Sequence, residues 1–142
     1  MRNYRIDHEG GAQEALFSWC DIQRGKYQEL RLLYHVPNGG KRDARTAMVL
    51  KRQGVKAGVP DLCLPVSRGG YHGLYIELKV GKNKPTDHQR EWLSDLRQQG
   101  YAAVVCYGWE NAAETLADYL ETGTLKETAA AQADAPALMP AT

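Results

Sequence analysis

The residues whose types could carry out chemistry fall in two short motifs, Pro60-Asp61 and Glu77-Leu78-Lys79. Successive side chains of a strand point to opposite faces, so Glu77 and Lys79 would share one face, about 7 Å apart along the backbone. The glycine-rich turn between the motifs would bring Asp61 beside Glu77. Two carboxylates, together with water and a phosphate oxygen, suit Mg²⁺. A lysine beside that metal would orient the attacking water and offset charge at phosphorus, so the motifs indicate hydrolysis of a phosphoester.

A simpler interpretation of the same residues stays open at this point. A Glu-x-Lys triplet occurs often by chance. Glu77 and Lys79 would then form an ion pair on a strand surface, and Asp61 would be a local cap. The triplet alone does not decide between the two interpretations.

The rest of the chain predicts the elements that would position the two motifs. Apolar periodicity, capping residues and glycine stops predict helices over residues 11–24, 44–53, 86–99 and 111–121. Apolar runs bounded by glycine and proline predict strands over residues 30–36, 60–66, 74–80 and 101–107. The last run is continuously apolar, which is typical of a central strand. Apart from the short second helix the order is α-β-β-β-α-β-α, which predicts an α/β fold with a mixed central sheet flanked by helices.

Length and composition are those of one globular domain. The 142 residues, 43% of them hydrophobic, suffice for a sizeable core, and no apolar run is long enough to span a membrane. Residues 1–124 are expected to form the domain, whereas the Ala/Pro-rich residues 125–142 lack apolar periodicity and are expected to be a disordered tail. Three widely spaced cysteines argue against a disulfide scaffold and a structural zinc site, and predict a cytoplasmic protein.

The formal net charge of +1 conceals a strong asymmetry along the chain. Residues 24–56 contain nine basic and two acidic residues, a net charge of +7, while residues 110–142 carry a net charge of −5. A basic stretch of this density attracts a polyanion, and the release of counterions would supply affinity for nucleic acid. An ordinary solvated surface explains the same lysines and arginines, so the charge alone leaves both interpretations open.

A longer motif extends the first short one and resembles that of a known family. Residues 51–62, Lys-Arg-Gln-Gly-Val-Lys-Ala-Gly-Val-Pro-Asp-Leu, look like the hallmark of the VRR-NUC domain, the virus-type replication–repair nuclease. Pro60-Asp61 followed by Glu77-Leu78-Lys79 is similar to the signature of the PD-(D/E)XK nuclease superfamily. The accompanying residues stand in the expected order: Glu14, His35-Val36-Pro37-Asn38-Gly39 and Gln89. The resemblance covers about residues 11–120.

The resemblance implies a restriction-endonuclease-like core and a metal-dependent site. Asp61, Glu77 and the main-chain carbonyl of Leu78 would bind Mg²⁺, with Mn²⁺ as a substitute, and Lys79 would orient the nucleophilic water. Glu14 would complete the acidic cluster through water or a second metal, and Gln89 would contact the site from the next helix. The DNA path would be lined by Asn38, Arg42, Arg45, Lys51, Arg52, Lys56, Lys82 and Lys84.

The function that the resemblance implies is the cleavage of DNA. Short chains of this kind resemble phage and bacterial Holliday-junction resolvases, which implies a structure-specific endonuclease of DNA repair, recombination or phage replication, in a bacterial cytoplasm or an infected host cell. A homodimer fits, because a symmetric four-way junction needs two equivalent cuts. The alternative is a non-catalytic DNA-binding module that has kept the nuclease fold. The complete acidic set of Glu14, Asp61 and Glu77 favours the enzyme.

Overall fold

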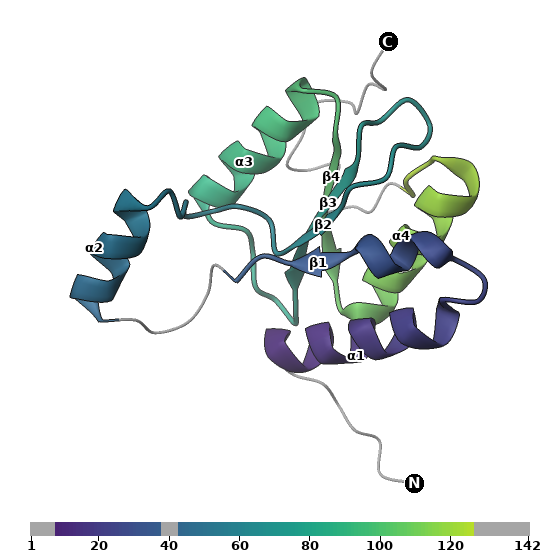
Figure 1. Ribbon diagram of the computed structural model, residues 1–142, viewed down its shortest axis with the longest axis horizontal. Helices are drawn as coiled ribbons and strands as arrows, with labels where there is room; N and C mark the ends of the chain where they lie inside the picture. Colours follow the sequence, from purple (N-terminus) through teal and green to yellow (C-terminus); the bar gives the residue numbers. More distant parts are fainter. Residues whose placement is uncertain (1–7, 38–42, 127–142) are drawn as a thin grey trace, which may run out of the picture.

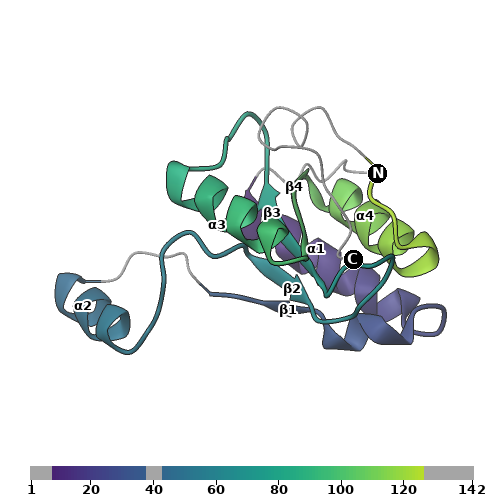
Figure 2. The ribbon, with the colours of Figure 1, turned by 90° about the horizontal axis from the view of Figure 1, so that it is seen from above.

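The computed structural model of the protein describes residues 8–37 and 43–126, which form a sheet with helices on both faces (Figure 1). The elements are α1 (Glu9–Gln23), the 3₁₀ helix η1 (Gln28–Leu32), β1 (Tyr34–His35), α2 (Ala44–Arg52), β2 (Leu62–Leu64), β3 (Leu74–Lys79), α3 (Asp87–Gln98), β4 (Ala102–Tyr107) and α4 (Trp109–Thr122). Helices α1 and α4 lie on one side of the sheet and α3 on the other (Figures 1 and 2). The predicted α/β fold, a mixed sheet flanked by helices, is confirmed.

The strands lie in the order β1-β2-β3-β4. β2 is antiparallel to both of its neighbours, and β4 is parallel to β3. The prediction that the strand over 101–107 is central is therefore wrong, because β4 lies at the edge of the described sheet. Its first five residues are nonetheless buried, since α4 packs on one of its faces and α3 on the other. Because helices cover both faces of β4, its run of residues is continuously apolar even though the strand is not central in the sheet.

The predicted strand over 30–36 is shorter in the structure and is preceded by a 3₁₀ helix. Leu30 and Leu33 are buried with exposures of 3% and 6%, whereas Leu32 is 39% exposed. Two buried residues three apart match the period of a 3₁₀ helix and not the alternation of a strand. Only Tyr34–His35 pairs with β2.

The main core lies between the sheet and helices α1 and α4. Leu16 of α1, Leu62 of β2, Ile76 of β3 and Leu116 of α4 belong to this core, with exposures of 1% or less. A smaller cluster on the opposite face packs Leu93 of α3 against β4. Within the described ranges, no helix has the length and apolar character needed to cross a membrane.

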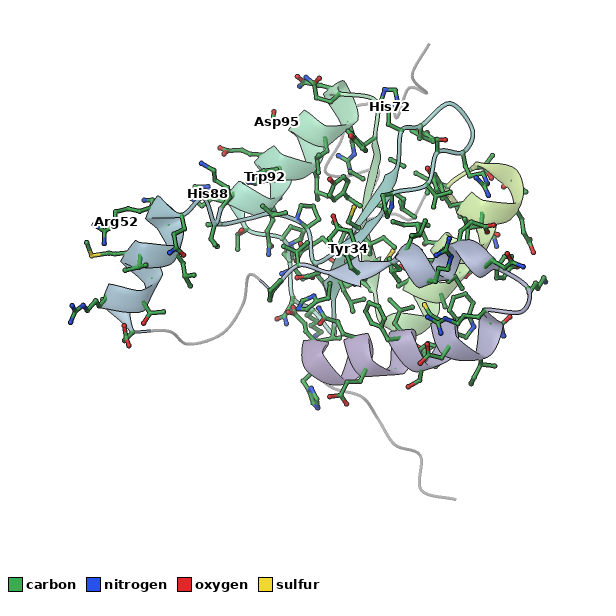
Figure 3. All side chains as sticks on the ribbon, in the orientation of Figure 1. Tyr34, Arg52, His72, His88, Trp92 and Asp95 are labelled. Atoms are coloured by element: carbon green, nitrogen blue, oxygen red, sulfur yellow. The ribbon has the colours of Figure 1, made fainter. Side chains whose placement is uncertain are left out.

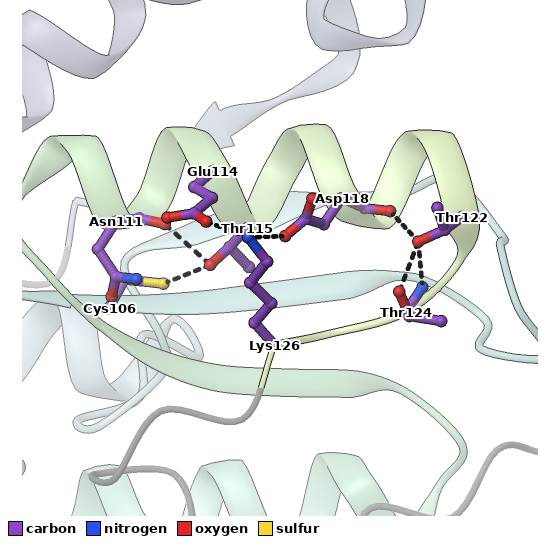
Figure 4. Close-up of polar contacts among 8 residues, drawn as sticks. All are labelled: Cys106, Asn111, Glu114, Thr115, Asp118, Thr122, Thr124 and Lys126. Carbon is purple, nitrogen blue, oxygen red and sulfur yellow. Dashed lines mark hydrogen bonds and ion pairs between the residues drawn. The ribbon is translucent and has the colours of Figure 1, made fainter.

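Polar contacts along α4 hold the end of the described chain (Figure 4). Lys126 pairs with Glu114, and its Nζ lies 3.7 Å from Oδ2 of Asp118. Leu125 packs against the main core. The predicted tail begins at residue 125, so its first two residues belong to the packed domain. Residues 127–142 lie outside the described part of the chain.

Helix α2 stands apart from the rest of the molecule in both ribbon views (Figures 1 and 2). Asp43 caps it by accepting a hydrogen bond from the Thr46 amide at 2.7 Å, and Gln53 is its C-cap, which confirms the helix predicted over 44–53. Every residue from 43 to 57 is exposed except Leu50, which is half-buried. Short helices gain most of their stability from packing, and this nine-residue helix finds little to pack against in its own fold.

Leu93 should be the residue that holds α3 on the sheet. It is 1% exposed and is the one buried residue of α3. Leu93→Ala should therefore lower the free energy of unfolding by about 2–5 kcal/mol, measured by urea denaturation. Leu32→Ala is the control, and it should cost far less because Leu32 is already 39% exposed. Equal losses in the two variants would contradict the packing described.

Candidate active site

Strand pairing places the carboxylates of the two motifs side by side. β2 and β3 are antiparallel with Leu62 opposite Ile76, and the same register continued by one residue sets Asp61 opposite Glu77. Oδ2 of Asp61 accepts a hydrogen bond from the Leu78 amide at 2.9 Å, which directs this carboxylate towards β3. The turn between the strands thus brings Asp61 beside Glu77, as the sequence predicted.

Glu77 is the buried centre of the site, with an exposure of 1%. Its Oε1 lies 3.0 Å from Nε2 of Gln89 and 3.6 Å from Nζ of Lys79. Its Oε2 is buried and has no hydrogen-bond partner among the residues that the structure describes. The pKa of Glu77 is raised to about 8, chiefly by burial and next by the neighbouring carboxylate of Asp61. A buried carboxyl group with an unsatisfied oxygen, next to a half-buried carboxylate, is an arrangement that a cation would stabilise.

Lys79 is buried as well, and it connects Glu77 to helix α1. Its exposure is 7%, and its Nζ lies 3.6 Å from Oε1 of Glu77 and 3.7 Å from Oε1 of Glu9. Glu77 and Lys79 are two residues apart on β3, which gives them the shared face that strand alternation predicts. The ammonium is therefore held between two carboxylates contributed by different elements.

The acidic residue that α1 brings to the site is Glu9, and the structure does not bring Glu14 there. The buried residues of α1 are Ala12, Leu16 and Cys20, and Glu9 precedes the first of them by three residues on the same side of the helix. Glu14 is exposed and lies five residues from Glu9, about 140° around the helix axis. The spacing 9, 12, 16, 20 was present in the sequence and would have identified Glu9. The order of the motifs along the chain, which led to the prediction of Glu14, does not show which face of α1 packs on the sheet.

Gln89 is held in the site by a capping box at the start of α3. Oγ1 of Thr86 accepts a hydrogen bond from the Gln89 amide at 3.2 Å, and Oε1 of Gln89 accepts one from the Thr86 amide at 2.8 Å. Because Oε1 is used in this way, the Nε2 donor of Gln89 faces Glu77. The structure thus brings Gln89 to the site, as predicted, in contact with a carboxylate.

The segment before Asp61 explains the glycine in the long motif. Gly58 has a φ of +88°, and a Cβ there would lie 2.7 Å from the backbone carbonyl carbon of His88, so no other residue fits without a shift. The main-chain oxygen of Asp61 accepts a hydrogen bond from the Val36 amide at 2.6 Å and lies 3.1 Å from Nδ1 of His35. His35 therefore helps to fix the backbone of Asp61. Sequence reasoning missed this contact, which depends on pairing between distant segments.

The donor set fits Mg²⁺ better than a metal that needs a full protein cage. Within residues 8–37 and 43–126, no three His, Cys, Asp or Glu side chains are grouped so as to hold an ion. Mg²⁺ is usually bound through one or two carboxylates and several waters, and Asp61 and Glu77 supply two carboxylates. Oε2 of Glu77 is the buried atom with capacity left for a cation. The carbonyl of Leu78 as a third ligand stays a prediction.

The basic residues expected along the nucleic acid are exposed wherever the structure describes them. One group lies on α2 and the segment after it, and the other lies on the loop that leaves β3 after Lys79. These residues are Arg45, Lys51, Arg52, Lys56, Lys82 and Lys84. Asn38 and Arg42 lie outside the described residues.

The chain is similar to known proteins over most of its length. A family model described as VRR-NUC domain matches residues 7–110. A solved structure named VRR_NUC domain protein is 34% identical, with a TM-score of 0.69, over 83% of this chain and 92% of that chain. No curated protein matches the chain. The matched residues include Asp61, Glu77, Lys79 and Gln89.

Glu77 should make the metal-free protein less stable as the pH rises. Its pKa is about 8 in the folded chain, against 4.5 for an ordinary glutamate. The folded state thus keeps a proton that the unfolded chain loses above about pH 4.5, so this contribution is complete below pH 4.5 and is lost as the pH rises towards 8. In EDTA, the Tm of the wild type should fall across this window relative to Glu77→Gln, whose side chain does not titrate. Parallel Tm profiles for the two proteins would refute the burial of a titrating Glu77.

Gln89→Ala should destabilise the site by removing two hydrogen bonds at once. The Thr86 amide and Oε1 of Glu77 would each lose a partner, and Glu77 is buried. The free energy of unfolding should fall by about 1–3 kcal/mol, the cost of leaving a buried polar group unsatisfied. Gln98→Ala makes the same change at an exposed position of α3 and should stay within about 0.5 kcal/mol of the wild type. Urea denaturation of both variants measures the difference, and similar values would argue that Gln89 is an ordinary surface residue.

Proposed function

The chain belongs to the VRR-NUC family, and on that basis we propose that it is a Mg²⁺-dependent DNA endonuclease that hydrolyses phosphodiester bonds. The observation that carries the proposal is the buried carboxyl group of Glu77 beside the half-buried Asp61, with Lys79 in contact with Glu77. Burying a carboxyl group beside a second carboxylate costs stability. A purely structural function gives no reason for that cost, whereas a cation site does.

Each residue of the site has a distinct task in this proposal. Asp61 and Glu77 would hold Mg²⁺ or Mn²⁺, with the main-chain carbonyl of Leu78 as the predicted third ligand. When bound, the ion supplies the Lewis acidity that activates a water and stabilises negative charge at phosphorus. Lys79 would orient the attacking water, and the proximity of its Nζ to Oε1 of Glu77 supports this role. Glu9 keeps this ammonium in position from 3.7 Å away.

Gln89 would position one oxygen of Glu77 and leave the other available. The Thr86 amide occupies Oε1 of Gln89, so the Nε2 donor is the group that meets Oε1 of Glu77. Oε2 of Glu77 then remains for the cation. This arrangement makes Gln89 a positioning residue that acts through Glu77.

Branched DNA is the substrate that the proposal favours. The net charge of +7 over residues 24–56 would bind phosphates without reading bases, so the shape of the DNA would decide where the enzyme binds. A homodimer would present two equivalent sites to a symmetric four-way junction. Such a Holliday-junction resolvase would serve DNA repair, recombination or phage replication in a bacterial cytoplasm or an infected cell.

The proposal is tested by cleavage of four-way junctions, flaps, nicked duplex and linear duplex in Mg²⁺, Mn²⁺ or EDTA. The wild type should cut in either metal and not in EDTA. Glu77→Ala should abolish cutting, and Lys79→Ala should slow it by about 10²–10⁴-fold, the usual contribution of a group that assists proton transfer. Glu9→Gln should cut more slowly than the wild type. Glu14→Gln is the matched control on α1 and should cut normally, because Glu14 is exposed away from the site.

Two results would contradict this proposal in different ways. Undiminished cutting by Glu77→Ala would remove the assigned site. Salt-sensitive binding of DNA by the wild type, without cutting in either metal, would indicate the non-catalytic DNA-binding module instead.

A further inference from the structure

Aromatic side chains form a row on the face of the sheet that α3 packs on, here called the tyrosine row and made up of Tyr34, Tyr75, Tyr101 and His72. Strand pairing sets Tyr34 of β1 opposite Cys63 of β2, and Cys63 opposite Tyr75 of β3. Residues that pair directly share a face, so two phenol rings flank the Cys63 thiol. The ring centroid of Tyr101 lies 5.4 Å from that of Tyr75 and 5.7 Å from that of His72.

The part of this face that carries Tyr34 is open to solvent. Among the elements that the structure describes, α3 packs on β4, and β4 and β1 lie at opposite edges of the sheet. Figure 3 shows Tyr34 on β1, well apart from Trp92 of α3. Tyr34 is 50% exposed, and Tyr75 is half-buried. Cys63 between them is nevertheless only 5% exposed, so the rings cover it and form a continuous aromatic surface.

The rings of the tyrosine row stay uncharged. Burial is the main cause that raises the pKa of Tyr75 to about 12, and Cys63, Tyr34 and Tyr101 add to the effect. Hydrogen bonding with the Cys63 thiol is the main cause that raises the pKa of Tyr34. Both phenols are therefore protonated at neutral pH and do not repel a polyanion. A neutral aromatic surface that is partly exposed suits the flat face of a nucleobase.

The tyrosine row leads directly to the carboxylates of the candidate active site. Tyr75 precedes Glu77 by two residues on β3, and Cys63 follows Asp61 by two residues. Side chains two residues apart on a strand share a face and lie about 7 Å apart along it. Successive nucleotides of one stacked DNA strand are spaced about 3.4 Å along the helix axis. The row therefore begins within about two nucleotides of a phosphate held at the carboxylates.

From this continuity we propose that the tyrosine row stacks on unpaired bases of the DNA substrate, next to the phosphate that is cleaved. Tyr34 is the most exposed tyrosine of the row and would be the principal stacking platform. The substrate class is then DNA with unpaired bases at a branch point, such as a flap or an opened junction. The inference rests on the proposed function, because it names the part of the DNA that would lie beside the proposed site.

Unpaired bases fit the tyrosine row better than paired ones. The bases of a duplex stack on each other and present only their edges in the grooves, so their flat faces are not available to a protein ring. The segment that contains Tyr34, residues 24–56, has a net charge of +7 and would hold the phosphates of the strand. Aromatic rings together with basic residues are the combination by which proteins bind single strands.

The test measures DNA binding by the full-length chain in EDTA, where no cutting is expected. The probes are a flap DNA with iodouracil as its first unpaired base and a fully paired duplex. Tyr34→Ala should weaken flap binding by about 5–150-fold, which corresponds to the loss of one stacked base, and should leave duplex binding unchanged. Tyr34→Phe keeps the ring and should bind the flap as the wild type does. Ile22→Ala is the control, because it removes a side chain that is 78% exposed on α1, and it should bind both probes normally.

Photo-cross-linking of the same flap locates the unpaired base on the protein. Irradiated iodouracil couples to an aromatic ring that stacks on it. Mass spectrometry should therefore find the cross-link in a peptide that contains Tyr34 or Tyr75. The yield at Tyr34 should persist in Ile22→Ala.

Several outcomes would overturn the stacking. Flap binding by Tyr34→Ala as tight as that of the wild type would do so, and so would cross-links confined to other segments. Equal losses in Tyr34→Phe and Tyr34→Ala would show that the hydroxyl and not the ring is needed. A Tyr34→Ala variant that changes the mass in solution but not DNA binding would make this face a protein-binding surface instead. Failure of the proposed function is distinct, because the wild type would then bind and cross-link the flap without cutting it in Mg²⁺ or Mn²⁺.

Discussion

The constraint on which the rest of the site depends is the burial of the Glu77 carboxyl group beside a second, half-buried carboxylate, that of Asp61. Asp61 and Glu77 face each other across the β2–β3 pair, and the pKa of Glu77 rises to about 8 as a result of burial and of its neighbour's charge. Each polar group around them limits this repulsion: the Leu78 amide binds Asp61, and Lys79 and Gln89 bind Glu77. One oxygen of Glu77 is still without a hydrogen-bond partner among the described residues, and this is an atom that a cation would satisfy.

The fold meets this constraint by bringing the first turns of two helices to the end of β3. Glu9 opens α1 and reaches Lys79, while Gln89 lies in the first turn of α3 and reaches Glu77. The N-terminus of a helix carries partial positive charge, which favours negative groups nearby. Both helices are fixed by their apolar sides, α1 through Ala12 and the buried residues that follow it and α3 through its buried leucine. The positions of the polar residues therefore follow from packing that is otherwise apolar.

Local patterns in the sequence predicted what depends on local geometry. Strand alternation placed Glu77 and Lys79 on one face, and Thr86 with Gln89 forms the capping box that starts α3. Local sequence patterns could not predict the features that depend on contacts between segments far apart in the chain. The apolar run of β4 shows that helices cover both faces of the strand. Such cover is possible for a central strand and for an edge strand, so the run does not give the position of β4 in the sheet. Glu9 and not Glu14 reaches the site because of which face of α1 packs on the sheet. The 3₁₀ helix in place of a strand at residue 30 is explained by the burial of both Leu30 and Leu33.

The basic helix α2 lies directly before the segment that carries Asp61. Its basic residues belong to the same continuous segment as Asp61, because Arg52 ends the helix nine residues before that carboxylate. Gly58, between them, packs on the backbone of His88 in α3, and Val59 lines an apolar groove two residues before Asp61. The lining of this groove therefore includes part of the segment that positions the carboxylate pair. The groove and the carboxylate pair share one short stretch of backbone, which gives a physical reason for the glycine and proline that fix its path.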